Sequence, residues 1–223
     1  MSAGVMWPQQ GIVAGYHMDD VNDFSGNGKT LTNNGTISFG GPGKFGNCAI
    51  LGSANSTKYL SRADGMGIDL SGACGFSGWF FLQANPASSK QCRMVDWRST
   101  TGTGRWLTLD YYNNSGTYQL TWYPNTASPI SFDYVLSLDT WHLADLDLNV
   151  DGYAYLYIDG CCVRVDARGT HLNAVNKTVI GAETAGTAGF YWFGNADEVA
   201  FFNCNRSAQR IRRWYAYSKG RLI

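Results

Sequence analysis

The densest group of oxygen-bearing side chains lies in one polar segment near the N-terminus. Residues 19–28 read Asp-Asp-Val-Asn-Asp-Phe-Ser-Gly-Asn-Gly, which brings Asp19, Asp20, Asp23 and Asn27 into one short loop. Carboxylate and amide oxygens are the ligands that Ca²⁺ prefers, and it takes about six to eight of them. The segment therefore predicts a calcium site or, alternatively, a set of turns whose carboxylates accept backbone N–H bonds.

A second chemistry is indicated where aromatic and amide side chains end apolar runs. Residues 111–114 read Tyr-Tyr-Asn-Asn, and residues 122–125 read Trp-Tyr-Pro-Asn. Sugars stack on aromatic rings while amides and carboxylates bind their hydroxyls, so these segments predict a sugar-binding surface. Aromatic residues also fill the space between two sheets or cover a protein interface, and both alternatives stay open. The candidate ligand-binding residues are Tyr111, Tyr112, Asn113, Trp122, Tyr123, Tyr191 and Trp192.

Residues 145–149, which read Asp-Leu-Asp-Leu-Asn, place Asp145, Asp147 and Asn149 on one face of a predicted strand. Retaining glycosidases need two carboxyl groups about 5–5.5 Å apart on either side of the bond that they cleave. Two short Asp side chains followed by an amide match this requirement poorly. We therefore interpret the segment as the solvated outer face of a strand, assign no catalytic residue and expect no enzymatic activity.

Charge is balanced over the chain but unevenly distributed along it. The chain has 17 Lys and Arg residues and 17 Asp and Glu residues, which excludes the strong positive field of a nonspecific nucleic-acid binder. From residue 205 onwards there is no acid, and the six positive residues are Arg206, Arg210, Arg212, Arg213, Lys219 and Arg221. This end predicts docking onto an acidic partner or, alternatively, a closing helix whose Arg stems cover apolar surface.

The N-terminus and the cysteines indicate the cellular compartment in which the protein is made. No run of about 18 apolar residues occurs, so no membrane span is expected, and the N-terminus lacks the basic and apolar regions of a secretory signal. The six cysteines, Cys48, Cys74, Cys92, Cys161, Cys162 and Cys204, contain no C-x-x-C spacing. We expect free, mostly buried thiols in a protein made in a reducing cytosol.

Short strands are the elements that would position these residues. The chain has 27 Gly, 13 Tyr, 11 Phe and 8 Trp residues, and alternating runs separated by turn signals are typical of a β-sandwich. A helix is expected only at residues 207–215, with Asn205 or Ser207 as its N-cap. Strands are expected at residues 11–18, 49–51, 59–60, 76–83, 93–97, 106–111, 118–123, 141–150, 153–158, 161–165, 177–180 and 197–202.

Six motifs in order along the chain carry a family resemblance. They are residues 11–20, 23–28 (Asp-Phe-Ser-Gly-Asn-Gly), 43–47 (Gly-Lys-Phe-Gly-Asn), 141–144 (Trp-His-Leu-Ala), 155–160 (Tyr-Leu-Tyr-Ile-Asp-Gly) and 194–199 (Gly-Asn-Ala-Asp-Glu-Val). Together the motifs resemble the laminin G-like, pentraxin-like branch of the concanavalin A-like lectin/glucanase superfamily. The resemblance implies an all-β, two-sheet antiparallel jelly-roll sandwich with one short C-terminal helix. It also implies one domain over residues 1–223, with its core at about 11–216.

The resemblance also implies a ligand set for calcium. In the family, the acidic loop and the Asp of an Asp-Glu-Val strand often surround a structural calcium ion. Carried over, the ligands would be Asp23, Asn27 and Asp197, with Asp20 as a further ligand. A structural Ca²⁺ is therefore the expected cofactor.

The function implied is binding or assembly without catalysis. An extracellular type of fold without a secretory signal resembles the jelly-roll modules of phage tails and capsids. We therefore expect a virion accessory protein, made in the host cytoplasm, that serves as a capsid decoration or tail component. The expected partners are other virion or surface proteins, further copies of the chain and cell-surface glycans. The alternatives are a secreted, extracellular carbohydrate-binding module and, less favoured, a glycoside hydrolase.

Overall fold

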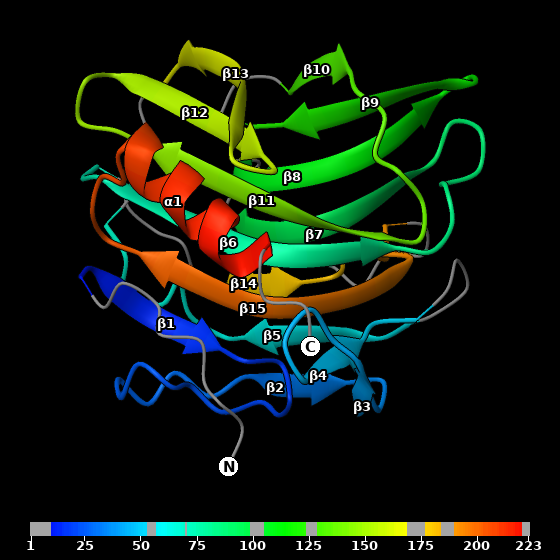
Figure 1. Ribbon diagram of the computed structural model, residues 1–223, viewed down its shortest axis with the longest axis horizontal. Coiled ribbons are helices and arrows are strands. Elements are labelled where there is room, and N and C mark those ends of the chain that lie inside the picture. Colours follow the sequence, from blue (N-terminus) through cyan, green and yellow to red (C-terminus); the bar gives the residue numbers. More distant parts are fainter. Residues whose placement is uncertain are drawn as a thin grey trace.

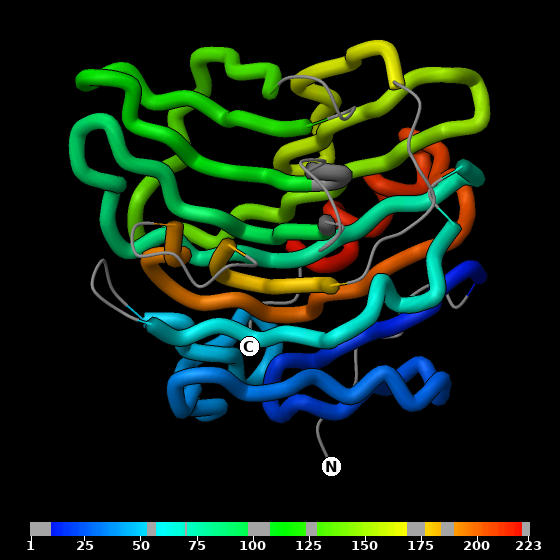
Figure 2. Tube along the Cα trace, turned by 180° about the vertical axis from the view of Figure 1, so that it is seen from behind, coloured from blue at the N-terminus to red at the C-terminus, as the bar shows by residue number. Residues whose placement is uncertain are grey.

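A computed structural model of the chain describes residues 10–52, 57–69, 71–98, 105–123, 129–168, 177–183 and 190–219. In these residues fifteen strands and one helix follow one another along the chain. The strands form two stacked sheets, which Figure 1 shows from one side and Figure 2 from the other. All their pairings are antiparallel.

Sheet A has eight strands in the order β13-β12-β11-β6-β15-β4-β3, and β1 also pairs with β15. Their bounds are β1 Ile12–Tyr16, β3 Ser38–Pro42, β4 Asn47–Ile50, β6 Cys74–Leu82, β11 Thr140–Leu148, β12 Tyr153–Ile158, β13 Cys161–Ala167 and β15 Gly194–Phe202. The long strand β6 lies between β11 and β15, so the centre of the sheet is built from its most apolar segments.

Sheet B has seven strands in the order β10-β9-β8-β7-β14-β5-β2. Their bounds are β2 Thr32–Asn34, β5 Tyr59–Arg62, β7 Gln91–Arg98, β8 Arg105–Asn114, β9 Thr117–Trp122, β10 Ile130–Asp133 and β14 Lys177–Ile180. The helix α1 (Ala208–Lys219) follows β15.

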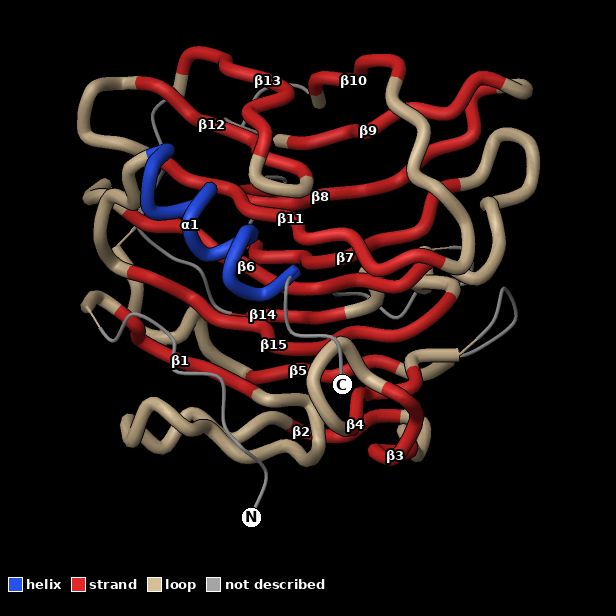
Figure 3. Tube along the Cα trace, viewed as in Figure 1, coloured by secondary structure: helices blue, strands red, loops and turns tan. Residues whose placement is uncertain are grey.

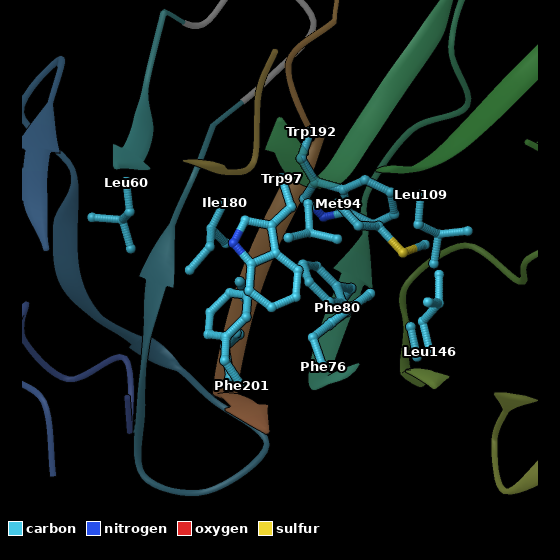
Figure 4. Close-up of a cluster of buried hydrophobic side chains, with 14 of the residues drawn as sticks. Leu60, Phe76, Phe80, Met94, Trp97, Leu109, Leu146, Ile180, Trp192 and Phe201 are labelled. Atoms are coloured by element: carbon cyan, nitrogen blue, oxygen red, sulfur yellow. The ribbon is translucent and has the colours of Figure 1, made fainter. Parts of the chain in front are cut away.

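The core lies between the two sheets, where alternate residues of each strand meet. Met94 and Trp97 enter it from sheet B, and Phe80 and Phe201 enter it from sheet A (Figure 4). The ring centroids of Trp97 and Phe201 are 5.2 Å apart. Since burying one large apolar side chain contributes about 1.5–3 kcal/mol, this cluster stabilises the stacking of the sheets.

The predicted all-β jelly roll with one C-terminal helix is confirmed. The strands expected at residues 153–158 and 177–180 have the predicted bounds. Ser207 caps α1, because its Oγ accepts a bond from the backbone N–H of Arg210 at 3.2 Å. The sequence pattern does not predict β2 and β3, because these short strands lack an apolar alternation and are mostly exposed or half-exposed. It also misses β10, whose alternation covers only four residues.

The two outer faces of the sandwich differ in what covers them. Helix α1 lies across the outer face of sheet A (Figure 3), where Trp214 packs with Trp79, Leu143 and Phe202 in a second apolar cluster. Among the described residues no helix covers sheet B. The side chains that face away from the core on the central strands of sheet B are nevertheless buried, Asp96, Thr108 and Asp110 among them.

Candidate functional site

The outer face of sheet B carries polar side chains on neighbouring strands. Register pairing joins them in two rows, Ser61–Val179–Asp96–Thr108 and Asp110–Thr121–Ser131. Leu109, between Thr108 and Asp110, points the other way into the core. Side chains alternate along a strand, so these polar residues all project away from sheet A.

A β-bulge in β7 brings two charged residues onto this face. The register shifts between Arg93 and Val95, and both Met94 and Val95 point into the core. In a regular strand, two residues three apart would face opposite sides of the sheet. The extra residue reverses the alternation, so Arg93 and Asp96 share the outer face.

Arg93 is the centre of a buried ionic network. Its Nε donates to Oδ1 of Asp110, its Nη2 donates to Oδ2 of Asp110 at 2.8 Å, and its Nη1 donates to Asp96 at 3.2 Å. Thr108 Oγ1 donates to the other oxygen of Asp96 at 2.8 Å. These four side chains are 0 % exposed. Burial acts to lower the pKa of Arg93, but its carboxylate partners raise it further, so the guanidinium stays charged.

Two residues that follow β14 in the chain, Glu183 and Phe190, complete the network on the outer side of the sheet. Glu183 Oε1 lies 3.5 Å from Nη1 of Arg93, and the guanidinium carbon of Arg93 lies 5.2 Å from the centre of the Phe190 ring. Tyr191 packs with Val179 on the same face, 6.5 Å from Tyr59 between ring centroids. We call this network of Arg93, Asp96, Thr108, Asp110 and Glu183 the floor of the site. Aromatic rings lie beside it.

The accessible part of this face surrounds the floor. Tyr59, Tyr112 and Gln119 are half-buried, and Ser131 is exposed. Tyr112 lies opposite Gln119 in the β8–β9 register, on the same side as Asp110. Rings, amides and hydroxyls held on rigid strands are the groups that bind the apolar faces and hydroxyls of sugars.

Three residues of the predicted ligand-binding set are in the core instead. Tyr111, Trp122 and Trp192 are 0 % exposed and belong to the cluster between the sheets. Their predicted ligand role is wrong, because rings enclosed on all sides have no surface to offer a sugar. They are the aromatic core residues that the alternative interpretation allowed.

The other four residues of the set lie at the surface or close to it. Tyr112 lies on the outer face of sheet B, and Tyr191 flanks it, 6 % exposed. Tyr123 is 9 % exposed at the end of β9. Asn113 is used internally, because its Nδ2 donates to the carbonyl of Pro86 at 2.9 Å. Residues 124–125, next to Tyr123, lie outside the described residues.

The predicted calcium loop is held together by its own carboxylates. Oδ1 of Asp23 accepts bonds from the N–H groups of Gly15 and Ser25, and Oδ2 accepts from Ser25 Oγ and the N–H of Lys29, all at 2.9 Å. Burial acts to raise the pKa of Asp23, but these bonds hold it below its usual value. Asp20 likewise accepts bonds from Asn22. The carboxylates thus act as turn caps, the alternative stated above.

Asp197 takes no part in the hydrogen bonds of that loop described above and lies on the outer face of sheet A. It is 0 % exposed, and its two oxygens accept bonds from the N–H groups of Phe45 and Glu198 at 2.8 Å. Burial and the neighbouring Glu198 raise the pKa of Asp197 well above its usual value.

As arranged, the predicted ligands do not fit a calcium ion. Asn27 donates its Nδ2 to the carbonyl of Val13, and both oxygens of Asp23 already accept two bonds each. In the described part of the chain, no group of three or more His, Cys, Asp and Glu side chains is placed to hold a metal ion. Calcium binding stays a prediction from the family resemblance.

The interpretation of residues 145–149 as a solvated strand face is wrong. Asp145 and Asp147 do face outward, but they are 0 % and 1 % exposed. Arg206 enters between them from the segment before α1 and donates to Oδ1 of each, at 2.7 Å to Asp145 and 2.8 Å to Asp147. A third bond joins Arg206 to the carbonyl of Phe76 at 2.9 Å. The helix and its flanking arginine, which the strand pattern cannot reveal, cover this face.

This second ionic cluster carries one more negative than positive charge. Burial raises the pKa of Asp147 to about 7, against the lowering effect of Arg206, and burial raises that of Asp145 as well. Oδ2 of each carboxylate has no hydrogen-bond partner among the described residues. One arginine cannot neutralise two buried carboxylates, so the pair holds a proton near neutral pH.

The thiols are free, but only half of them are buried. Cys48, Cys74 and Cys92 are buried, whereas Cys161 and Cys162 are exposed at the start of β13 and Cys204 is intermediate. The expectation that most thiols are buried is therefore corrected. No described helix is long and apolar enough to cross a membrane.

The sequence does not predict a role for the four charged residues of the floor, Arg93, Asp96, Asp110 and Glu183. Arg93 and Asp96 stand in an otherwise apolar run, which is a signal, because charges buried in a strand are paired. Their spacing, however, predicts opposite faces, and only the bulge places them together. Asp110 and Glu183 carry no local signal, since their partner lies on another strand.

The fold and this face define a lectin-like jelly-roll domain. The family model of the concanavalin A-like lectin/glucanases superfamily matches residues 54–212, and the chain belongs to this superfamily. The predicted family is thus confirmed. By sequence, no curated protein matches the chain.

Solved structures share the fold at low identity. Domain 4 of AbnA, an extracellular arabinanase from Geobacillus stearothermophilus, was solved in complex with arabinotriose; it is 16% identical, with a TM-score of 0.70 over 91% of this chain and 97% of that domain. The receptor binding domain of botulinum neurotoxin D is 14% identical, with a TM-score of 0.72 over 96% of this chain and 54% of that one. The chain thus spans about half the length of this toxin domain.

Proposed function

We propose that the chain is a non-catalytic glycan-binding domain that holds neutral oligosaccharides on the outer face of sheet B. The observation that carries the proposal is the rigid floor around Arg93, beside which Tyr59, Tyr112 and Gln119 remain partly accessible. Rigid strands position these side chains, so little freedom is lost when a sugar binds.

Charge supports a neutral ligand. The floor combines one arginine with three carboxylates, those of Asp96, Asp110 and Glu183. The bidentate bond to Asp110 and the contacts with the other two acids occupy the guanidinium, so it is not available to an anionic sugar. The arabinanase domain of the same fold is described in complex with a neutral sugar, arabinotriose.

Acidic residues on both outer faces are held by arginines, which favours binding without catalysis. Asp145 and Asp147, the pair that a glycosidase hypothesis would use, are enclosed beneath α1 and bound by Arg206. On sheet B, both oxygens of Asp110 accept bonds from Arg93, so this carboxylate is held in an ion pair and not placed against a substrate. We expect no release of reducing ends from any oligosaccharide that the protein binds.

A glycan array followed by calorimetry tests the proposal. Neutral oligosaccharides, arabinotriose among them, should bind, whereas their sialylated or sulfated counterparts should not. Tyr112→Ala should weaken binding about tenfold, because a stacking contact of about 1.4 kcal/mol is removed. Tyr153→Ala removes an exposed tyrosine from sheet A and serves as the matched control. Equal loss in both variants, or binding of anionic glycans alone, would refute the proposed site.

We also propose that the domain works on a virus particle, as a capsid decoration or tail component. This rests on the resemblance to jelly-roll modules of phage particles and on the free thiols. The competing proposal is a secreted carbohydrate-binding module. Alkylation of the protein from its natural source, unfolded in denaturant without a reductant and followed by intact mass measurement, separates the two. Six alkylated cysteines support assembly in a reducing cytosol, and oxidised pairs support secretion.

A further inference from the structure

A second surface lies on the opposite side of the sandwich, where the β12–β13 hairpin meets α1. Its exposed members are Tyr153, Cys162 and Val165 from the hairpin and Arg212 from the helix, and Tyr155 is half-buried among them. Tyr153 and Val165 are 49 % and 44 % exposed. The register pairs Tyr155 with Val165, so the hairpin residues share the outer face of sheet A.

The hairpin and the helix form one rigid surface. Gly160, in the turn between β12 and β13, lies so close to Tyr215 of α1 that a Cβ there would be 2.9 Å from it. Arg212, about one helical turn before Tyr215, lies near Cys162: burial raises the pKa of that thiol, and Arg212 acts to lower it. The surface therefore exists as a unit in the folded protein.

The tyrosines are arranged for contact with protein and not with sugar. The rings of Tyr155 and Tyr157 stack on each other, with centroids 6.5 Å apart and planes 22° apart. The hydroxyl of Tyr155 donates to Asp151 at 2.9 Å, which fixes the ring. The stack and this hydrogen bond hold the two rings in fixed positions. Rigid tyrosines beside an arginine are typical of protein interfaces.

Charge on this side is positive and partly uncompensated. Helix α1 carries four cations and no acid, whereas the hairpin and its two ends, residues 151–168, carry three acids and two arginines. Each hairpin acid has a partner within the chain: Asp151 binds Tyr155, Asp159 binds His142 and Asp166 binds Arg164. Arg212 is exposed and has no ion-pair partner among the described residues. A carboxylate from outside the chain is the group that this arginine would bind in bidentate fashion.

We propose that this surface docks an acidic segment of another protein, whose carboxylates pair with Arg212 and whose apolar side chains cover Tyr153 and Val165. A second copy with the same contacts is disfavoured, because a two-fold contact would place α1 near its own positive image. The docking surface is independent of the glycan-binding face, since the two lie on opposite sheets.

The test uses the full chain and a synthetic 12-residue peptide in which Glu alternates with Val. Titration monitored by ¹⁵N NMR should move the amide signals of residues 153–165 and of α1. Arg212→Glu should weaken binding at least tenfold, whereas Lys90→Glu, an exposed cation in the loop before β7, should change it less than twofold. Tyr153→Ala should weaken binding about threefold to tenfold, because it removes the apolar half of the contact.

Three results would overturn the inference. One is equal binding of a peptide in which Lys replaces Glu. Another is a general attraction of polyanions, shown either by equal loss of affinity in the Arg212→Glu and Lys90→Glu variants or by tighter binding of heparin or single-stranded DNA. The third is concentration-dependent broadening of the same signals without peptide, which would show that a second copy covers the surface. None of these results bears on sugar binding by Tyr112 and its neighbours.

Discussion

At the scale of residues, two buried arginines organise the two outer faces of the sandwich. Arg93 joins the charged residues of sheet B, and Arg206 joins the segment before α1 to Asp145 and Asp147 of sheet A. Removing one partner of a buried ion pair is costly, because it leaves an uncompensated charge away from water. These two arginines are therefore the single side chains on which stability should depend most.

Arg206→Ala should destabilise the fold by about 3–5 kcal/mol, because Asp145 and Asp147 then lose the arginine that binds both of them. Arg212→Ala is the control: it removes an exposed arginine nearby and should change stability by less than about 0.5 kcal/mol. Urea unfolding of the three proteins measures both effects. A similar, small change in the two variants would show that Arg206 does not hold the acidic pair.

Asp147 should make stability depend on pH. Its pKa is raised to about 7 in the folded protein. Between the ordinary pKa of an aspartate and about pH 7, the folded state therefore keeps a proton on Asp147 that the unfolded chain has already released. The resulting stabilisation is complete at about pH 4 and is lost as the pH rises through about 7.

We expect the free energy of unfolding to fall by on the order of 2 kcal/mol between pH 5 and pH 8. His17 acts in the same direction, because its bond with Glu198 raises its pKa. Asp147→Asn mimics the protonated side chain and should make the profile less steep, leaving the parts due to Asp145, Asp197 and the histidines. A profile as steep as that of the original protein would contradict the assignment to Asp147.

At the scale of elements, the sequence predicts strands better than it predicts what covers them. Alternation places Asp145 and Asp147 on the outer face correctly, since period and register are local properties of a strand. It does not predict their burial, because this depends on where a helix some sixty residues later docks. The bulge in β7 is likewise invisible, because one extra residue leaves no mark on composition. As a result, the sequence suggests Tyr112 and Tyr191 but not Arg93.

The helix provides an element-scale prediction. Ser207 accepts a bond from the N–H of Arg210, so Ser207→Ala should destabilise the protein by about 0.5–2 kcal/mol. Ser207→Asp keeps an acceptor and adds a favourable charge at the helix N-terminus, so it should retain the original stability. Thermal unfolding of both variants measures the difference. If aspartate destabilised as much as alanine, Ser207 would not be acting as a cap.

At the scale of the whole molecule, the two outer faces of the sandwich differ in chemistry. Helix α1 closes sheet A with an apolar cluster, and sheet B turns polar strands outward. Such a division suits a binding protein, because the apolar cluster under α1 adds stability while the strands of sheet B hold polar side chains in fixed positions.

Metal removal tests the arrangement of the acidic loop. Because Asp23 is saturated by internal hydrogen bonds, a chelator should leave the melting temperature unchanged. A ligand bound only to the folded state would raise that temperature. A fall of several degrees in EDTA, reversed by Ca²⁺ but not by Mg²⁺, would show that the loop rearranges into a calcium site.

The most direct test of the account is to map where a sugar binds. In a ¹⁵N NMR titration with the oligosaccharide that binds best on the array, we expect saturable shifts at Ser61, Asp96, Tyr112, Gln119 and Thr121. These residues lie on four strands of sheet B and meet only on its outer face. Saturable shifts confined to residues 19–28 or to α1 would contradict the proposed site, as would the lack of saturable binding by any neutral oligosaccharide.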